Sequence, residues 1–171
     1  MSDKQILITV GTTKFENLIK AIDTDNFYNM IIEHKFTKII IQKGIGEYIP
    51  KNYEKYKDKI NIQISTILND FENIIKNSEI IISHGGAGII LECLKNKRKV
   101  IVCVNDTLMD NHQIELATTL DKEGYVHYCK NVNNIISDIE SILNSKKEIK
   151  PYPEINYNAI PNLIYSMLDL K

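Results

Sequence analysis

The chain has 171 residues, 43% of them hydrophobic and 25% charged, with a formal net charge of −1. This length is typical of one domain with a sizeable core. The near-neutral charge argues against a nucleic-acid partner, because phosphate binding needs clustered positive charge. No apolar run approaches the ~20 residues of a membrane span, and the first residues lack the pattern of a secretory signal. Three cysteines without paired spacing favour a reducing compartment, so we expect a cytoplasmic protein.

Short apolar runs alternate with segments of helical spacing along the chain. Strands are expected at 4–10, 37–42, 60–65, 79–83, 99–104 and 125–129. Helices are expected at 15–23, 25–35, about 67–75, 88–96, 110–123 and 132–144, with 50–59 as a polar excursion into solvent. This alternation predicts an α/β fold of the Rossmann-like, doubly wound type with a mostly parallel sheet.

The C-terminal part of the chain differs in composition. Charged residues and then Pro151 and Pro153 mark residues 145–156 as a linker. Apolar residues then recur with the spacing of one helix face over about 157–169. We therefore expect a domain at 1–145, followed by a linker and an amphipathic helix at 146–171. The helix either packs on its own sheet or docks on a partner, and the intervening prolines favour docking.

Polar or glycine-rich segments follow four of the expected strands. They are residues 11–13, 42–46, 84–88 and 105–113. Because the carboxyl ends of parallel strands share one edge, these segments are expected to lie together. Ligands of doubly wound sheets bind at this edge. The sequence therefore predicts a ligand site formed by these segments.

The segment His-Gly-Gly-Ala-Gly at 84–88 joins an expected strand to an expected helix. Glycines allow the backbone to approach a ligand closely, and the free N–H groups of a helix start favour an anion such as a diphosphate. Glu92, one turn further on, is placed to accept hydrogen bonds from ribose hydroxyls. The alternative is a turn made for close packing, with Glu92 solvated. Neither the dinucleotide fingerprint nor the P-loop pattern occurs.

Taken in order, these segments resemble the donor-binding, C-terminal half of GT-B glycosyltransferases, in the family that includes the bacterial lipid II-forming GlcNAc transferase. The resemblance is carried by Val-Gly-Thr-Thr at 10–13, Gln-x-Gly-x-Gly at 42–46, the segment 83–88 with Glu92, and Asn-His-Gln at 111–113. Within that family, it is similar to the small soluble subunits of eukaryotic two-subunit UDP-GlcNAc transferases. These add the second GlcNAc to dolichyl-diphosphate-GlcNAc for N-glycosylation, at the cytosolic face of the endoplasmic reticulum.

The resemblance implies a role for each segment. The glycine-rich segment would cradle the UDP diphosphate, Glu92 would hold the ribose, and residues 111–113 would face the donor sugar and phosphates. The backbone at Ile67 and Leu68 would meet the uracil, and the segments after the first two strands would line the interdomain cleft. The implied substrate-binding residues are Thr12, Thr13, Gln42, His84, Gly85, Gly86, Ala87, Gly88, Glu92, Asn111, His112 and Gln113.

The implied reaction is an inverting transfer from UDP-GlcNAc, which needs a base on the acceptor and stabilisation of the leaving diphosphate. Helix N–H groups supply the second, so neither a metal nor another cofactor is expected. His84 and His112 are the weak candidates for the base within this chain, and the base is expected in the other half. Because a GT-B enzyme has two halves, the resemblance implies a membrane-anchored, acceptor-binding partner subunit.

Two alternatives stay open. One keeps the fold and the reaction class but changes the sugar, as in split polysaccharide glycosyltransferases that use another UDP-sugar. The other is a non-catalytic, nucleotide-binding scaffold subunit. In that case site substitutions would leave the activity of the complex unchanged, whereas deletion of residues 157–171 would abolish assembly.

Overall fold

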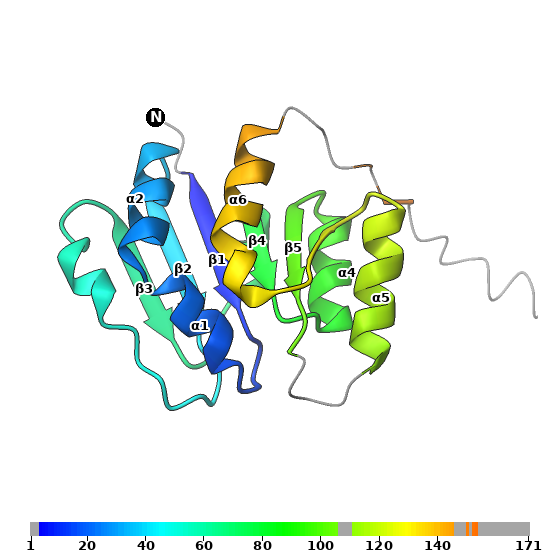
Figure 1. The fold of residues 1–171 in the computed structure, drawn as a ribbon, viewed down its shortest axis with the longest axis horizontal. Helices are drawn as coiled ribbons and strands as arrows, with labels where there is room; N and C mark the ends of the chain where they lie inside the picture. Colours follow the sequence, from blue (N-terminus) through cyan, green and yellow to red (C-terminus); the bar gives the residue numbers. More distant parts are fainter. Residues whose placement is uncertain (1–3, 106–110, 146–149, 151, 154–171) are drawn as a thin grey trace, which may run out of the picture.

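The computed structural model describes residues 4–105, 111–145, 150 and 152–153. Within these residues the core is a six-stranded sheet with the order β3-β2-β1-β4-β5-β6 (Figure 1). Every pair of neighbouring strands is parallel. The strands are β1 Gln5–Thr9, β2 Lys38–Gln42, β3 Asn61–Ser65, β4 Ser78–Ser83, β5 Lys99–Cys103 and β6 His127–Cys129. The predicted doubly wound parallel sheet is therefore confirmed.

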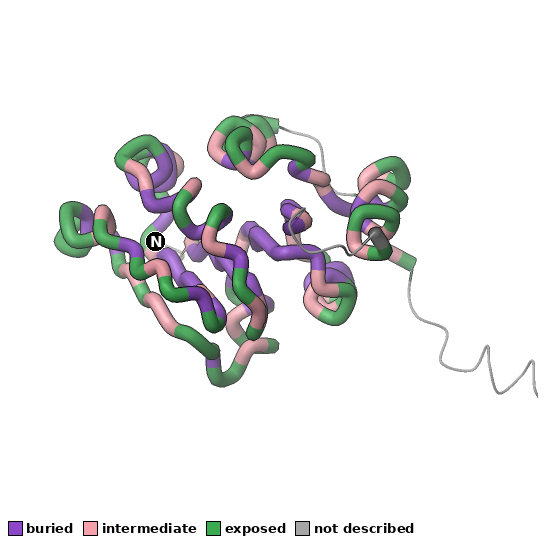
Figure 2. Tube along the Cα trace, turned by 60° about the horizontal axis from the view of Figure 1, so that its bottom comes forward, coloured by how far each residue is buried: buried purple, intermediate pink, exposed green. Residues whose placement is uncertain are grey.

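Helices cover both faces of the sheet. They are α1 Glu16–Ile22, α2 Asp25–Glu33, α3 Phe71–Asn77, α4 Ala87–Lys95, α5 Asn111–Lys122 and α6 Ile135–Asn144, with short 3-10 turns at η1 Asn52–Lys55 and η2 Val132–Asn134. Buried side chains of α1, α2 and α6 pack in one core cluster, and those of α3, α4 and α5 pack in the other. Figure 2 shows the buried strands between helices whose outer sides are exposed.

The four central strands β1, β2, β4 and β5 are buried on both faces, which explains their apolar runs, whereas the edge strand β3 is partly exposed and alternates apolar with polar residues. In β1, Ile6 and Ile8 belong to the cluster under α1, whereas Leu7 belongs to the cluster on the other face. All three side chains are fully buried. Full burial of such a side chain contributes about 1.5–3 kcal/mol.

The topology reverses at β1. The chain runs outward from β1 to β2 and β3, and then returns to place β4 on the other side of β1. The loops that follow β1 and β4 therefore lie side by side at the carboxyl edge. This edge is the lower one in Figure 1, where the loop after β2 also lies. A doubly wound sheet binds its ligands at such a reversal point.

The loop after β2, residues 43–51, is held against α1 by two carboxylates. Glu16 accepts from the backbone N–H groups of Glu47 and Tyr48 at 2.9 and 3.3 Å. Asp23, which is buried, accepts from the Tyr48 hydroxyl and the Lys51 N–H, both at 2.8 Å. We call residues 43–51 the β2 loop. The N–H groups of Glu47, Tyr48 and Lys51 and the Tyr48 hydroxyl thus tie the loop to the end of α1 and its first turn.

Replacement of Glu16 by glutamine is expected to loosen the β2 loop. The N–H of Glu47 is the main cause that lowers the Glu16 pKa to about 2 from 4.5. Stability from this carboxylate is therefore present above pH 4.5 and is lost as pH falls through about 2. In the Glu16→Gln variant, the Glu47 and Tyr48 amides should exchange hydrogen faster, as measured by NMR. Unchanged exchange would show that the carboxylate does not hold the loop.

Two parts of the sequence prediction are wrong in detail. The helix expected from about residue 67 begins at Phe71, because Asp70 adopts a left-handed conformation with φ of +56° and starts the helix there. The excursion expected at 50–59 is not wholly solvated. Tyr56 is buried, and its ring stacks on that of Tyr28 at 4.8 Å between centroids.

The linker is described only in part, and the helix expected at 157–169 lies outside the described residues. The N–H of Lys150 donates to the Gly124 carbonyl at 3.3 Å. The ring of Tyr152 packs edge-on against Tyr125 with 5.0 Å between centroids. These described residues of the linker thus lie against the turn between α5 and β6.

Candidate functional site

A pocket of about 460 Å³ opens at the carboxyl edge where β1 and β4 adjoin. Its lining combines the loops after β1, β2, β3 and β4, which are far apart in sequence. The lining residues are Gly11, Thr12, Thr13, Gln42, Ile67, Leu68, Phe71, His84, Gly86, Gly88 and Ile89. Thr12, Thr13, Gln42, His84, Gly86, Gly88, Ile67 and Leu68 are thus brought together, as the sequence analysis expected. We call this the switch-point pocket.

A buried hydrogen-bond chain fixes the β1 and β2 side of the pocket. The Thr9 hydroxyl donates to Gln42 Oε1 at 2.8 Å and accepts from the Gly11 N–H at 3.0 Å. Thr9 and Gln42 are both buried. Because the amide oxygen of Gln42 is engaged by Thr9, its NH₂ group is left as the donor toward a ligand. Sequence reasoning missed Thr9, whose signal was a polar residue that ends an apolar strand.

His84 is the first residue after β4, and its ring lies close to Gly11 of the loop after β1 and to Gly86 of its own loop. A Cβ atom at Gly11 or Gly86 would lie 2.9 Å from its Cε1 atom, so only glycine fits at these two positions without displacing the ring. Burial lowers the pKa of His84, and a hydrogen bond to the Thr9 backbone opposes this only in part. Its Nδ1 atom is buried and has no hydrogen-bond partner among the described residues. The imidazole is therefore neutral at neutral pH and offers no positive charge to a phosphate.

The stability of the protein is expected to fall in acid because of His84. Its folded-state pKa lies below the 6.5 of the unfolded chain, so the unfolded state takes up the proton first. The free energy of unfolding should therefore decrease as pH falls below about 6.5, and His84→Gln should remove much of this decrease. Urea unfolding at several pH values measures it, with His34→Gln as the control for losing a histidine. An unaltered slope in His84→Gln would contradict the burial of a neutral ring.

The N-terminus of α4 is open to a ligand. Gly86 is the N-cap residue, and no side chain caps the helix. Ala87 and Gly88 are exposed, and a Cβ atom at Gly88 would meet nothing within 4 Å. The N–H groups of the first turn are thus unshielded, and together with the helix dipole they favour a bound anion.

The start of α5 adjoins the same turn. A Cβ atom at Gly85 would lie 3.5 Å from Gln113 Oε1, so Gln113 lies against the glycine-rich segment. Gly85 has a φ of +97°, which glycine adopts without strain. His112 is exposed, whereas the side chain of Asn111 and residues 106–110 lie outside what the structure describes. Of the three residues expected at 111–113, the structure therefore places Gln113 at the site.

Glu92 lies one turn along α4 and does not line the switch-point pocket. Its Oε1 atom accepts from Asn96 Nδ2 at 3.0 Å, and its Oε2 atom lies 3.5 Å from Lys95 Nζ. The Glu92 side chain is 30% exposed. Surface pairs of this kind contribute about 0–1 kcal/mol. A ribose hydroxyl could therefore displace Lys95 at little cost.

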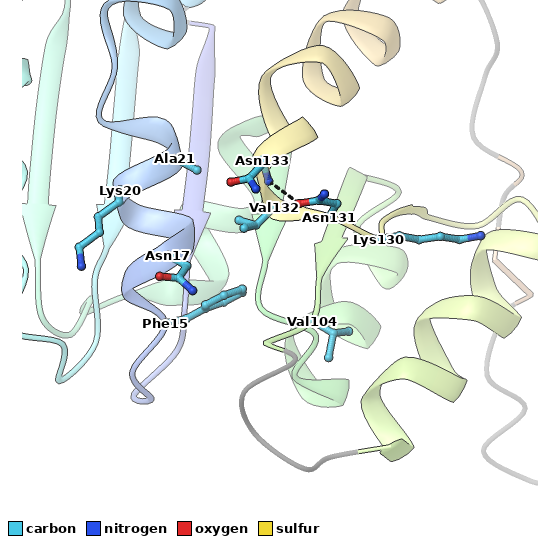
Figure 3. A pocket seen from close by; sticks show the side chains of 9 residues that line it. All are labelled: Phe15, Asn17, Lys20, Ala21, Val104, Lys130, Asn131, Val132 and Asn133. Atoms are coloured by element: carbon cyan, nitrogen blue, oxygen red, sulfur yellow. Dashed lines mark hydrogen bonds between the residues drawn. The ribbon is translucent and has the colours of Figure 1, made fainter.

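A second and larger pocket, of about 690 Å³, lies between α1 and η2 (Figure 3). Its polar side chains, Asn17, Lys20, Lys130, Asn131 and Asn133, are exposed. The hydrogen bond drawn in Figure 3 joins the N–H of Asn133 to Asn131 Oδ1 at 3.0 Å. No residue expected from the sequence lies in this pocket. We place the candidate site in the switch-point pocket, because buried partners fix its polar groups.

Three further observations concern the described residues alone. No group of three or more His, Cys, Asp or Glu side chains among them is arranged to hold a metal ion. No helix among them is long and apolar enough to cross a membrane. Cys93, Cys103 and Cys129 are free and buried.

The family model described as "Glycosyltransferase family 28 C-terminal domain" matches residues 5–163. The chain belongs to this family. The resemblance noted from the sequence is thereby confirmed. The matched residues include all six strands and every residue that lines the switch-point pocket.

Named relatives of this family 28 chain include the human UDP-N-acetylglucosamine transferase subunit ALG13, which is 32% identical over 126 residues. That match covers 74% of this chain but only 11% of the human protein, so the chain spans about a tenth of that relative. The Saccharomyces cerevisiae protein of the same name is 27% identical, with 90% of each chain covered.

Solved structures agree with the family on the fold. An NMR solution structure of ALG13 has a TM-score of 0.65 at 24% identity and covers 99% of this chain and 97% of its own. The crystal structure of Acinetobacter baumannii MurG has a TM-score of 0.65 at 17% identity. It covers 98% of this chain, which matches 50% of the MurG chain. The family 28 chain thus corresponds to half of that longer protein.

Proposed function

We propose that this chain is the donor-binding, catalytic subunit of an inverting N-acetylglucosaminyltransferase that uses UDP-GlcNAc. The observation that carries the proposal is the uncapped N-terminus of α4 at the reversal point of the sheet, beside the buried Thr9–Gln42 pair. Relatives that carry the name UDP-N-acetylglucosamine transferase subunit support this choice of donor.

In the proposed donor complex, the diphosphate lies at the start of α4. The N–H groups of Ala87, Gly88 and Ile89 point out of the first turn, where no side chain competes for them. As the bond to the sugar breaks, negative charge develops on the diphosphate, and pre-oriented N–H donors stabilise it. One such donor is typically worth about 2.7–4 kcal/mol in the transition state. We propose that no metal is required, since these donors and the helix dipole carry the charge.

The proposed uracil position is the apolar end of the switch-point pocket. Leu68, Phe71 and Ile89 line this end, and the backbone at Ile67 and Leu68 is not part of a helix or strand. Backbone N–H and C=O groups of such a segment are free to pair with the edge of a base. Glu92 would then hold the ribose, between the base and the diphosphate.

The general base of the proposed reaction comes from the partner subunit. The Nδ1 atom of His84 is buried, and the ring lies close to Gly11 and Gly86, so an acceptor hydroxyl does not reach this nitrogen. His112 is exposed on the first turn of α5 and is the remaining candidate in the described part of this chain. We propose that a membrane-anchored, acceptor-binding subunit supplies both the base and the dolichyl-diphosphate-GlcNAc acceptor, at the cytosolic face of the endoplasmic reticulum.

The test is a transfer assay with the co-purified complex. We expect labelled GlcNAc to move from UDP-GlcNAc to dolichyl-diphosphate-GlcNAc, with the same rate after addition of EDTA. Transfer from UDP-Gal in preference to UDP-GlcNAc would instead support the alternative of a split polysaccharide glycosyltransferase. Full activity after substitution at Gly86 or Glu92 would support the non-catalytic scaffold alternative.

A further inference from the structure

The β2 loop, residues 43–51, presents two large apolar side chains to solvent. Ile45 is 69% exposed and Ile49 is 62% exposed. Between and beside them, Gly46 and Pro50 are buried, and the Tyr48 hydroxyl points inward to Asp23. Several backbone N–H groups of the loop and the Tyr48 hydroxyl bond to the protein, whereas the two isoleucine side chains face outward.

The β2 loop is also held against the switch-point pocket. The N–H of Ile45 donates to the Thr13 carbonyl at 3.2 Å. A Cβ atom at Gly44 would lie 1.9 Å from that same carbonyl oxygen, so the two loops are in close contact. Together with Glu16 and Asp23, these contacts order the loop in the free chain. A surface that is ordered before binding loses less conformational entropy when a partner covers it.

The position of the loop indicates which partner covers it. The loop begins directly after Gln42, which lines the switch-point pocket, and it lies at the carboxyl edge of the sheet (Figure 1). If the proposed function holds, on which this inference rests, the acceptor must reach a donor bound at this edge. The protein that carries the acceptor therefore lies over the edge and over the adjoining loop. This chain also matches only half of the MurG chain, and its relatives are named as a subunit.

We propose that Ile45 and Ile49 anchor an apolar patch of the acceptor-binding subunit at this edge of the chain. Exposed Glu47 and Lys51 provide polar groups at the rim, and the isoleucines form the apolar centre, which is the usual arrangement of a specific protein interface. The docking seats the acceptor site of that subunit beside the switch-point pocket. The β2 loop thus completes the active site by positioning the second subunit.

The first test is photo-crosslinking in the source cells. The photoreactive amino acid benzoylphenylalanine replaces Ile45, Ile49 or, as a control, Leu91, which is 41% exposed on α4. We expect positions 45 and 49, and not 91, to crosslink to one membrane protein whose depletion removes GlcNAc transfer. Crosslinks to lipid, to a second copy of the chain or to its own residues 154–171 would overturn the proposal, as would the lack of any crosslink.

The second test separates docking from donor binding. The double variant Ile45→Glu/Ile49→Glu should bind UDP-GlcNAc as an isolated chain like the parent, because neither side chain lines the pocket. Its affinity for the acceptor-binding subunit should fall about tenfold or more, as is typical when central interface residues are lost. Leu91→Glu should change neither property. Normal assembly of the double variant would overturn the docking proposal alone, whereas a parent chain that assembles but binds no UDP-GlcNAc would overturn the proposed function alone.

Discussion

Replacing Glu92 by alanine is expected to reduce GlcNAc transfer by the complex about 100-fold or more while the fold stays intact. A hydrogen bond to a charged group is worth about 1.5–3 kcal/mol, and a ribose offers two hydroxyls to one carboxylate. The fold should be unaffected, because the Glu92 side chain is partly exposed and its carboxylate pairs with helix neighbours, with Asn96 at 3.0 Å and with Lys95 at 3.5 Å. Steady-state kinetics with UDP-GlcNAc and a thermal unfolding curve measure the two effects.

The matched control for this prediction is Glu140→Ala. Glu140 is an exposed glutamate within α6, on the face of the sheet opposite α4. Its removal changes the net charge by the same amount and should leave transfer unchanged. If Glu92→Ala retained the full rate, the ribose would not be held at this position. The donor would then have to lie elsewhere along the edge.

Replacing Gly86 by alanine is expected to impair both stability and transfer. The backbone of Gly86 has a φ of −61°, which alanine adopts freely, so the effect is steric. The new methyl group would lie 2.9 Å from Cε1 of the buried His84 ring, so the ring would have to shift. Overpacking of this kind costs about 1–3 kcal/mol. Urea unfolding and the transfer assay measure the two losses.

Two companion variants test the cause. His84→Ala in the Gly86→Ala background should restore much of the stability, because the clash needs both groups. Gly88→Ala should be as stable as the parent or up to ~1 kcal/mol more stable, since its methyl group meets nothing within 4 Å and alanine favours a helix. A Gly86→Ala variant as stable as the parent would show that the ring is not confined between the two glycines.

The elements that the sequence predicted well are those with a local signal. The strands β1, β4 and β5 each contain an unbroken run of at least three apolar residues, because both faces of the sheet are covered, so they could be recognised without knowing their neighbours. The glycine-rich segment at 84–88 could also be placed from the sequence. The apolar residues before it form a continuous run typical of a buried strand, and those after it follow helical spacing. The alternation of strands and helices predicted a parallel sheet, and therefore that the segments after the strands lie together at its carboxyl edge.

The features that the sequence did not predict depend on residues brought together by the fold. The Thr9–Gln42 hydrogen bond joins two strands, and the confinement of His84 needs glycines from two loops. The inward-facing polar groups of the β2 loop depend on Asp23 from the end of α1. The late start of α3 follows from the left-handed conformation of Asp70, which the helical spacing of the apolar residues concealed.

The most direct test of the account is an NMR titration of the ¹⁵N-labelled chain with UDP-GlcNAc. The central claim is that the donor diphosphate binds at the start of α4 in the switch-point pocket. We predict progressive shifts of the amides of Gly86, Ala87 and Gly88, together with those of Thr12 and Thr13, and a marked weakening of this binding in Glu92→Ala. Shifts confined to the pocket between α1 and η2, or amides at 86–88 that do not respond to UDP-GlcNAc, would contradict the claim.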